Sequence, residues 1–240
     1  MIFMIATRNA ANSDCEKLGR ISALSWLSHP EIALLTKALV WVNFGAHELI
    51  LQGAAFASEA HIQLSGVSRI TSLNSRGERV TVSFVAPGPI PEFPSVPLSR
   101  FAFQCEAFNH CRVGSLAWKN FDAITVNSPQ SAVRKFHEHD LQQWYRLLLR
   151  SSSFLNLALH ERIALTLLEL SSQFGIEESR GTLLRVGFSH KDIAELVGAS
   201  RPRVTEHLAR LERDQFVLRD GRRLFVQVAK LADSMTVHAA

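Results

Sequence analysis

The strongest constraint on the fold is a pair of short amphipathic segments between residues 189 and 211, separated by a turn of three residues. Ser189 and Asp192 stand at capping-box spacing at the start of the first segment. Gly198-Ala199-Ser200 forms the turn, because glycine accepts a left-handed backbone without a steric penalty. Pro202 stands just inside the start of the second segment, a position that proline favours. Helix, short glycine turn and helix is the signature of a helix-turn-helix.

A β-hairpin is predicted directly after the second helix. Val204, Leu208 and Leu211 recur at helical spacing and form the inward face of that helix. Two short apolar strands follow within residues 216–226, joined by Asp220-Gly221, which is a favoured two-residue turn. The segment as a whole therefore predicts a winged helix-turn-helix.

Arginine dominates the charge of this segment. Between Ala199 and Arg223 there are seven arginines, no lysine and four acidic residues, which gives a net charge of +3. Arginine forms bidentate hydrogen bonds with phosphate and guanine. A helix N-terminus that carries Ser200, Arg201 and Arg203 can direct N–H and guanidinium groups at DNA. The alternative is a solvated face on an ordinary helical pair, but the ordered combination of cap, glycine turn, arginines and hairpin favours DNA binding.

The first half of the chain predicts an antiparallel β domain. Six short apolar runs, several of them alternating with polar residues, indicate strands at 47–51, 61–64, 67–73, 80–85, 101–105 and 111–116. Many short strands with frequent turns are typical of a jelly-roll sandwich or barrel. A helix is expected to begin near Pro30, and the proline-rich stretch 87–97 is expected to be irregular.

A long helix is predicted to open at Ser128-Pro129 and to carry one apolar face. That face either packs against its own domain or forms the seam of a homodimer. The candidate dimerisation residues are Val133, Phe136, Asp140, Leu141, Trp144, Leu147 and Leu148. Ser151-Ser152-Ser153 weakens a helix and is a candidate hinge. A second helix is expected over 157–174, closed by Gly175.

These segments resemble one known family. Residues 188–212 closely resemble the winged-helix region of the Crp/Fnr family of bacterial transcription regulators, and residues 161–170 resemble the helix just before it. The order of segments is similar as well. The resemblance implies an α+β protein with an N-terminal jelly-roll β sandwich or barrel, a long dimerisation helix and a C-terminal winged helix-turn-helix. The expected domain boundaries are 1–126, 127–153 and 154–240.

The resemblance also implies a homodimer that binds a palindromic site on double-stranded DNA, with RNA polymerase as a candidate further partner. By position, Arg201 matches the family's base-contacting arginine and Glu206 matches a base-reading position. Ser200, Arg203 and Lys191 match positions that contact phosphate. The predicted DNA-binding set is completed by Pro202, Thr205, Arg210 and Arg222. Pro202 replaces a glutamate of the best-known member, so a different target sequence is expected.

The sensor half resembles the family's cyclic-nucleotide-binding domain, and Glu92 and Arg100 are the candidate effector residues. The expected phosphate cassette departs from the family pattern. Pro91 removes a backbone N–H just before Glu92, and Phe101-Ala102 follows Arg100 where a hydroxyl residue is expected. The sequence therefore predicts no cofactor and no control by cyclic AMP. A cyclic-nucleotide-responsive regulator stays open as an alternative.

The chain holds three cysteines, Cys15, Cys105 and Cys111, a number that suits a reducing cytoplasm. An iron–sulfur cluster needs about four thiolates, so no cluster is expected. Cys105 and Cys111 are either a redox pair activated by His110 or two buried core residues. The isolated histidines are expected to be solvated, and no metal site is predicted.

Two further function classes are considered. A cupin-type jelly-roll metalloenzyme needs clustered histidine and glutamate ligands, and His47-Glu48 with His61 falls short of that set. An interaction module that no longer binds DNA conflicts with the arginine content of 201–223. No Walker loop, dinucleotide fingerprint or nucleophile elbow is present, so the chain is predicted not to be an enzyme. With 47% hydrophobic and 20% charged residues and no apolar run near 18 residues, a cytoplasmic globular protein without a membrane partner is expected.

Overall fold

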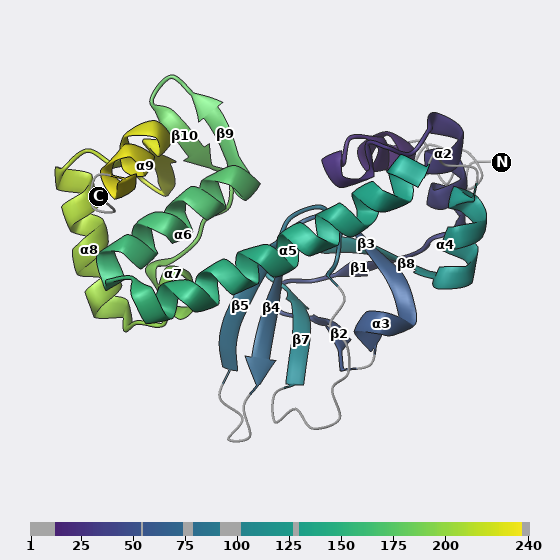
Figure 1. Cartoon of the computed structure of the whole chain (residues 1–240), viewed down its shortest axis with the longest axis horizontal. Coiled ribbons are helices and arrows are strands. Elements are labelled where there is room, and N and C mark those ends of the chain that lie inside the picture. Colours follow the sequence, from purple (N-terminus) through teal and green to yellow (C-terminus); the bar gives the residue numbers. More distant parts are fainter. Residues whose placement is uncertain (1–12, 54, 74–78, 92–101, 127–129, 237–240) are drawn as a thin grey trace. The chain divides into compact units, whose positions relative to one another are not determined.

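The computed structural model describes residues 13–53, 55–73, 79–91, 102–126 and 130–236. The chain divides into two compact units, Met1–Leu147 and Leu148–Ala240. The long helix α5 (Gln130–Asn156) begins in the first unit and ends in the second (Figure 1). Ser151-Ser152-Ser153 lies inside α5 and does not end it, and the Ser153 hydroxyl donates to the Arg150 carbonyl at 2.7 Å. No described helix has the length and apolar character needed to cross a membrane.

Two four-stranded antiparallel sheets form the first unit. One has the order β1-β8-β3-β6 and the other β2-β7-β4-β5. The strands are β1 (Val40–Phe44), β2 (Leu49–Gln52), β3 (Glu59–Ser65), β4 (Ser68–Leu73), β5 (Arg79–Val85), β6 (Gly88–Pro89), β7 (Ala102–Ala107) and β8 (Cys111–Ala117). The first strand pairs with the last, the second with the seventh, and so on inward. This is the pairing of a long hairpin wrapped into a jelly roll, so that prediction is confirmed in its sandwich form.

The core of the first unit lies between these sheets and under a set of helices. Ile70 and Cys105 from one sheet meet Cys111 and Val113 from the other. A second apolar cluster joins β3 and β8 to residues 13–19, η1 (Ser22–Leu24), α2 (His29–Ala38) and α4 (Trp118–Thr125). The short helix α3 (Ala55–Ser58) precedes β3. One buried carboxylate, Glu106 on β7, pairs with Arg69 and Arg79, as a buried charge must.

The sequence patterns misplaced several edges of this unit. Helix α2 begins near Pro30 as predicted. After Leu39 the chain becomes extended and forms β1, a strand that is absent from the six predicted strands. Val40 is 67% exposed, so this edge strand lacks a buried alternating pattern that would reveal it. His47 has a φ of 70° in a turn, and β2 starts only at Leu49.

The second unit places α6 (Leu159–Phe174) against the other helices of the winged domain (Figure 1). Its buried residues Ile163, Leu167 and Leu170 contribute to the interior together with Ile193 and Phe225. A four-stranded sheet of order β11-β12-β10-β9 completes the unit. The remaining elements are β9 (Gly175–Glu178), β10 (Gly181–Leu184), α7 (His190–Val197), α8 (Arg201–Arg213), β11 (Val217–Asp220), β12 (Arg223–Val226) and α9 (Val228–Thr236).

Gly175 ends α6 as predicted, but by a different mechanism. Its φ of −84° is an ordinary extended value, so no left-handed cap is involved. A Cβ at this position would lie 2.2 Å from the Ser171 carbonyl oxygen and 2.4 Å from Thr182 Cγ2. Glycine is therefore required because α6 and β10 approach the backbone too closely for a side chain.

We expect Gly175→Ala to lower the free energy of unfolding of the second unit by about 1–3 kcal/mol, the usual cost of overpacking. Gly187→Ala is the matched control, because a Cβ there meets no described atom within 4 Å. Native-state hydrogen exchange of α6 amides measures both variants. Tryptophan fluorescence does not serve here, because all four tryptophans precede residue 148. Equal protection in the two variants would contradict this account of Gly175.

Candidate nucleic-acid interface

The turn between α7 and α8 has the geometry that the sequence predicts. Ser189 Oγ accepts from the Asp192 backbone N–H at 3.2 Å, and the Asp192 carboxylate accepts from the Ser189 N–H at 2.7 Å. Gly198 adopts φ 61° and ψ 46°, which is the left-handed conformation. A Cβ on Gly198 would also lie 2.6 Å from Phe154 Cε1. The capping box and the glycine together fix where α7 ends and α8 begins.

Helix α8 presents a polar face to solvent from its first residue. Val204 and Leu208 are buried, whereas Arg201, Pro202, Arg203, Thr205 and Glu206 are exposed. Ser200 occupies the N-cap position, but within the described part of the chain its hydroxyl makes no capping hydrogen bond. The first turn thus carries exposed N–H groups, a hydroxyl and two guanidinium groups, a combination suited to binding an anion.

Arg213 is a candidate contact that the sequence reasoning missed. Positions 206, 209 and 213 are separated by three and four residues, so they share one face of α8. Arg213 is exposed and lies in the last turn, where a positive charge is also favoured by the helix dipole. The seven-residue spacing between Glu206 and Arg213 could have identified it from the sequence, because residues two helical turns apart share one face.

The wing is present, with its turn displaced by one residue from the prediction. Asp220 pairs with Arg223, so the two-residue turn is Gly221-Arg222 and not Asp220-Gly221. Gly221 takes a φ of 59°, and Arg222 is exposed at the tip. The shift pairs Arg223 with Asp220, where the predicted turn would have paired it with Leu218. Arg223 forms an ion pair with Glu178 on β9 at 2.8 Å.

Two histidine-centred contacts join the wing to both helices. His190, the first residue of α7, has its Nε2 2.8 Å from Arg219 Nη2 on β11 and its Nδ1 2.8 Å from Thr205 Oγ1 on α8. The Thr205 hydroxyl lies 3.0 Å from the Arg201 carbonyl oxygen. Arg219 also donates to Glu212 at 3.0 Å. Sequence reasoning found Thr205 but not His190 or Arg219, because nothing local marks a contact between residues 29 positions apart.

The other two predicted contacts lie at the margins of the interface. Lys191 is exposed on α7, with its Nζ 3.8 Å from Glu195 Oε1. Arg210 lines a cavity of about 260 Å³ together with His160, His207 and Phe216. The His160 and His207 rings stack there with centroids 6.4 Å apart. Burial and nearby positive charge lower the pKa of His207, although Glu206 opposes this shift.

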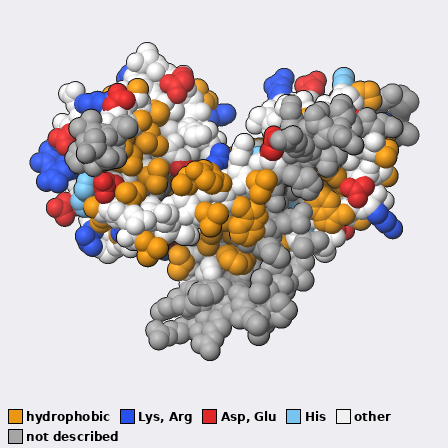
Figure 2. Space-filling model, in the orientation of Figure 1, with side chains coloured by type: hydrophobic (Ala, Val, Ile, Leu, Met, Phe, Trp, Pro, Cys, Tyr) orange, Lys and Arg blue, Asp and Glu red, His pale blue; other side chains and the backbone are white. Residues whose placement is uncertain are grey.

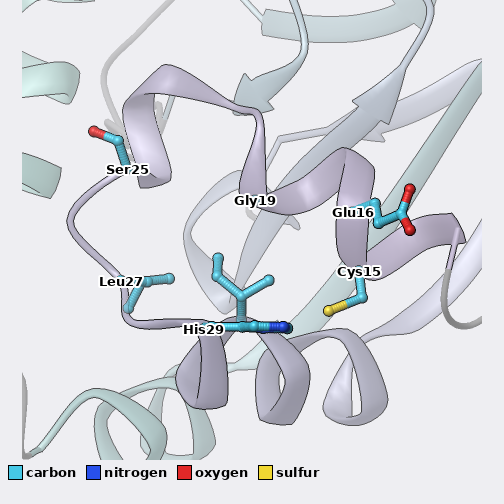
Figure 3. Close-up of a pocket in the computed structure, with 7 residues that line it drawn as sticks. Cys15, Glu16, Gly19, Ser25, Leu27 and His29 are labelled. Carbon is cyan, nitrogen blue, oxygen red and sulfur yellow. The ribbon is translucent and has the colours of Figure 1, made fainter.

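The candidate effector residues Glu92 and Arg100 lie outside the described residues. The first unit does contain a cavity of about 580 Å³ between residues 13–19 and α2. Figure 3 shows the Cys15 thiol and the His29 ring pointing toward one another across it, with the Glu16 carboxylate directed away. No three of the described histidine, cysteine, aspartate and glutamate residues come together to hold a metal ion.

His61 corrects the expectation that the isolated histidines are solvated. Its side chain is buried on β3, with Nε2 2.9 Å from the Ala55 carbonyl oxygen and Nδ1 2.9 Å from Ser115 Oγ. Both ring nitrogens are therefore hydrogen-bonded, and the residue has a structural role in the jelly roll. His47 is exposed, as expected.

Cys105 and Cys111 are both buried in the jelly-roll core. Burial raises the pKa of the Cys105 thiol to about 12, and burial raises the pKa of Cys111 to about 11. A thiol is reactive as its thiolate, so these environments suppress the reactivity that a redox pair needs. The geometry favours the alternative of two small core residues.

We expect iodoacetamide at pH 8 to label Cys15 first in the folded chain, because that side chain is only partly buried. Labelling of Cys105 and Cys111 should be at least about 100-fold slower, since the thiolate fraction falls as the pKa rises. Mass spectrometry of quenched digests gives the three rates, and urea-unfolded chain serves as the control. Native Cys105 labelled as fast as Cys15 would refute this assignment.

The candidate dimerisation residues on α5 separate into two faces. Trp144 and Leu147 pack against the core of their own unit, whereas Leu141 and Leu148 are each 66% exposed. Tyr145, which the sequence reasoning missed, is 61% exposed between them. Figure 2 shows hydrophobic side chains gathered on the surface over the middle of α5. For Val133, Phe136 and Asp140, which lie on the same helix, the side chains are outside the described set.

Comparison with known proteins shows which domain family the segment from α6 to α9 matches. The model of the Crp-like helix-turn-helix domain matches residues 161–233, from α6 to α9. The chain carries a Crp-like helix-turn-helix domain. The match includes both helices of the motif and the wing. No curated protein matches the chain significantly.

Solved structures extend the likeness to most of the chain. A transcriptional regulator of the CRP family from Thermus thermophilus is 23% identical with a TM-score of 0.60, and the match covers 81% of this chain and 96% of that one. FixK2 from Bradyrhizobium japonicum is 19% identical with a TM-score of 0.66, covering 81% and 96%. The c-di-GMP-responsive regulator CLP from Xanthomonas campestris is 18% identical with a TM-score of 0.59, covering 83% and 99%.

At these identities the likeness is one of fold. Together with the domain match, it confirms the predicted resemblance to the Crp/Fnr family and the predicted order of jelly roll, long helix and winged helix-turn-helix. The chain thus has the fold of Crp/Fnr transcriptional regulators and carries a Crp-like helix-turn-helix domain at residues 161–233.

Proposed function

We propose that this chain is a sequence-specific DNA-binding transcription regulator that acts as a homodimer on a palindromic site and is not controlled by cyclic AMP. The observation that carries the proposal is the exposed first turn of α8, with Arg201 and Arg203 beside backbone N–H groups, inside a Crp-like domain. Such a helix N-terminus suits insertion into the major groove. The wing tip at Arg222 suits a flanking phosphate contact. The proposed activity is binding and not catalysis.

Homodimerisation is proposed from the exposed apolar face of α5. Leu141, Tyr145 and Leu148 are spaced by four and three residues, so they line one stripe of the helix. A contiguous apolar stripe of this kind usually marks a protein contact. A second copy of the chain is the occupant that a two-fold symmetric DNA site requires, because it supplies a second recognition helix about 34 Å away.

Independence from cyclic AMP rests on the sequence around the candidate effector residues. Pro91 lacks the N–H that a phosphate cradle needs, and Phe101 stands where a hydroxyl residue is expected after Arg100. Control by another nucleotide is the second candidate, because one protein of similar fold responds to c-di-GMP. Redox control by Cys105 and Cys111 receives no support from their raised pKa values.

Selection from random duplex DNA tests the proposal directly. The purified full chain is used with no nucleotide, with cyclic AMP, with cyclic GMP and with c-di-GMP. Recovery of one palindrome under all four conditions is the expected result. Recovery only with a nucleotide would replace the proposal with the nucleotide-controlled alternative, and recovery of no sequence preference would overturn specific DNA binding.

Arg201→Ala should remove sequence preference, because a bidentate contact with a base is worth about 1–3 kcal/mol of discrimination. Arg222→Ala should weaken binding to all sequences equally and reduce the salt slope by about one. Fluorescence anisotropy on the selected palindrome and on a scrambled duplex, at several salt concentrations, separates the two effects. Binding that is unchanged in both variants would disprove this placement of the interface.

Leu148→Glu should convert the dimer into a monomer, because it places a charge in the apolar stripe of α5. Light scattering after size exclusion gives the mass. The control is Gln142→Glu on the same helix, which adds the same charge at an exposed position that is turned about 100° around the helix from Leu141. A Leu148→Glu chain that stays dimeric would show that this stripe is not the dimer contact.

A further inference from the structure

His190 is the place where three parts of the winged domain meet. It is the first residue of α7, it contacts Thr205 in the first half of α8, and it contacts Arg219 on the wing strand β11. Arg219 in turn reaches Glu212 near the end of α8. The side chain is half-buried at this junction. One imidazole therefore connects the wing to the helix that carries the proposed base contacts.

The direction of each hydrogen bond follows from the donors available. A guanidinium group has only donors, so Arg219 donates and His190 Nε2 accepts. The neutral imidazole then carries its hydrogen on Nδ1 and donates it to Thr205 Oγ1. The Thr205 hydroxyl donates onward to the Arg201 carbonyl oxygen. The result is a one-way relay from the wing to the first residue of α8, and it exists only while His190 is neutral.

We propose that His190 is a positioning residue of the DNA interface, and that its protonation loosens the wing from the recognition helix and lowers base selectivity. The proposal rests on the function proposed above. When the relay is closed, Arg201 and the wing tip at Arg222 are held in one fixed arrangement. When Nε2 gains a proton it becomes a donor facing another donor, and Arg219 keeps only its bond to Glu212.

The surrounding charges favour the closed state near neutral pH. Burial lowers the pKa of His190 below its ordinary value of 6.5, and Arg219 from β11 and Arg201 from α8 lower it further. Glu212, also from α8, acts in the opposite direction. Because the folded pKa is the lower one, the neutral form stabilises the domain above about pH 6.5. This contribution is lost as the pH falls through the folded pKa.

Acid is expected to act oppositely on affinity and on selectivity. A protonated His190 adds positive charge beside DNA, which strengthens binding to any duplex through phosphate contacts. The same proton removes the bond between Arg219 and His190 Nε2, so the wing is no longer coupled to Arg201, although the Nδ1 bond to Thr205 persists. The ratio of affinity for the selected palindrome to affinity for a scrambled duplex should therefore fall with pH, while binding to the scrambled duplex rises. A residue that only supports the fold would not produce this divergence.

Anisotropy titrations between pH 5.5 and pH 7.5 measure that ratio. We expect the wild-type ratio to fall about tenfold, the scale of one lost hydrogen bond to a charged group. His190→Gln cannot titrate yet offers an acceptor to Arg219, so its ratio should vary less than about twofold. His207→Gln is the matched control, because His207 lies on α8 outside the relay and its pKa is also lowered. Its ratio should follow the wild type.

Nuclear magnetic resonance of the free protein tests the relay without DNA. Imidazole ¹⁵N shifts should identify the neutral ring of His190 as carrying its hydrogen on Nδ1. Arg219→Gln removes the neighbouring cation, so it should move the His190 pKa up toward 6.5. A hydrogen on Nε2 in the neutral wild-type ring would overturn the proposal, and so would an Arg219→Gln chain in which the His190 pKa stays where it was.

The outcomes separate this proposal from the function on which it rests. A palindrome bound with selectivity that does not change with pH leaves the regulator intact and overturns the role of His190. A His190→Gln ratio that falls as steeply as the wild type does the same. A wild-type chain with no sequence preference at any pH overturns both.

Discussion

The left-handed turn at Gly198 is the constraint on which the DNA-facing surface depends. With φ at 61° the chain reverses within three residues, so α8 starts immediately beside the end of α7. Any side chain at this position would meet Phe154 as well as the steric cost of the conformation. The apolar faces of α7 and α8 can then share one interior with α6. Arg201 and Arg203 are left in solvent because the buried face of α8 is already filled by Val204 and Leu208.

Charge in the winged domain does two different things. Arg180 and Arg223 are used inside it: their guanidinium groups lie over the buried Phe225 ring and pair with Asp220 and Glu178. Arg201, Arg203 and Arg222 remain exposed. The count of seven arginines between Ala199 and Arg223 therefore overstates the number available to DNA, because Arg223 is among them and pairs with Glu178. Arg180 and Arg223 hold the wing in place, and Arg222 at its tip stays exposed.

Two features account for the jelly-roll unit: the alternation of apolar residues along its strands, and the wrapping of one long hairpin. Alternating apolar residues specify strands, and wrapping the hairpin pairs the first strand with the last. Polar groups caught inside are satisfied there: Glu106 by Arg69 and Arg79, and His61 by Ala55 and Ser115. The same burial that makes this interior stable keeps Cys105 and Cys111 protonated. A cysteine buried in the core is therefore a poor nucleophile, because burial disfavours the reactive thiolate.

The sequence by itself determined the helix-turn-helix, the jelly roll and the long helix, because capping boxes, glycine turns and apolar periodicity act over a few residues. The wing turn was predicted one residue too early, since Asp220-Gly221 and Gly221-Arg222 are both acceptable turns and only pairing with β12 selects the second. Edge strand β1 had no buried face to reveal it. The division of α5 into core and exposed residues, and the contact of His190 with Arg219, were decided only by the tertiary structure. Both join residues far apart in the chain, and no local pattern encodes a contact whose partner is supplied by another element.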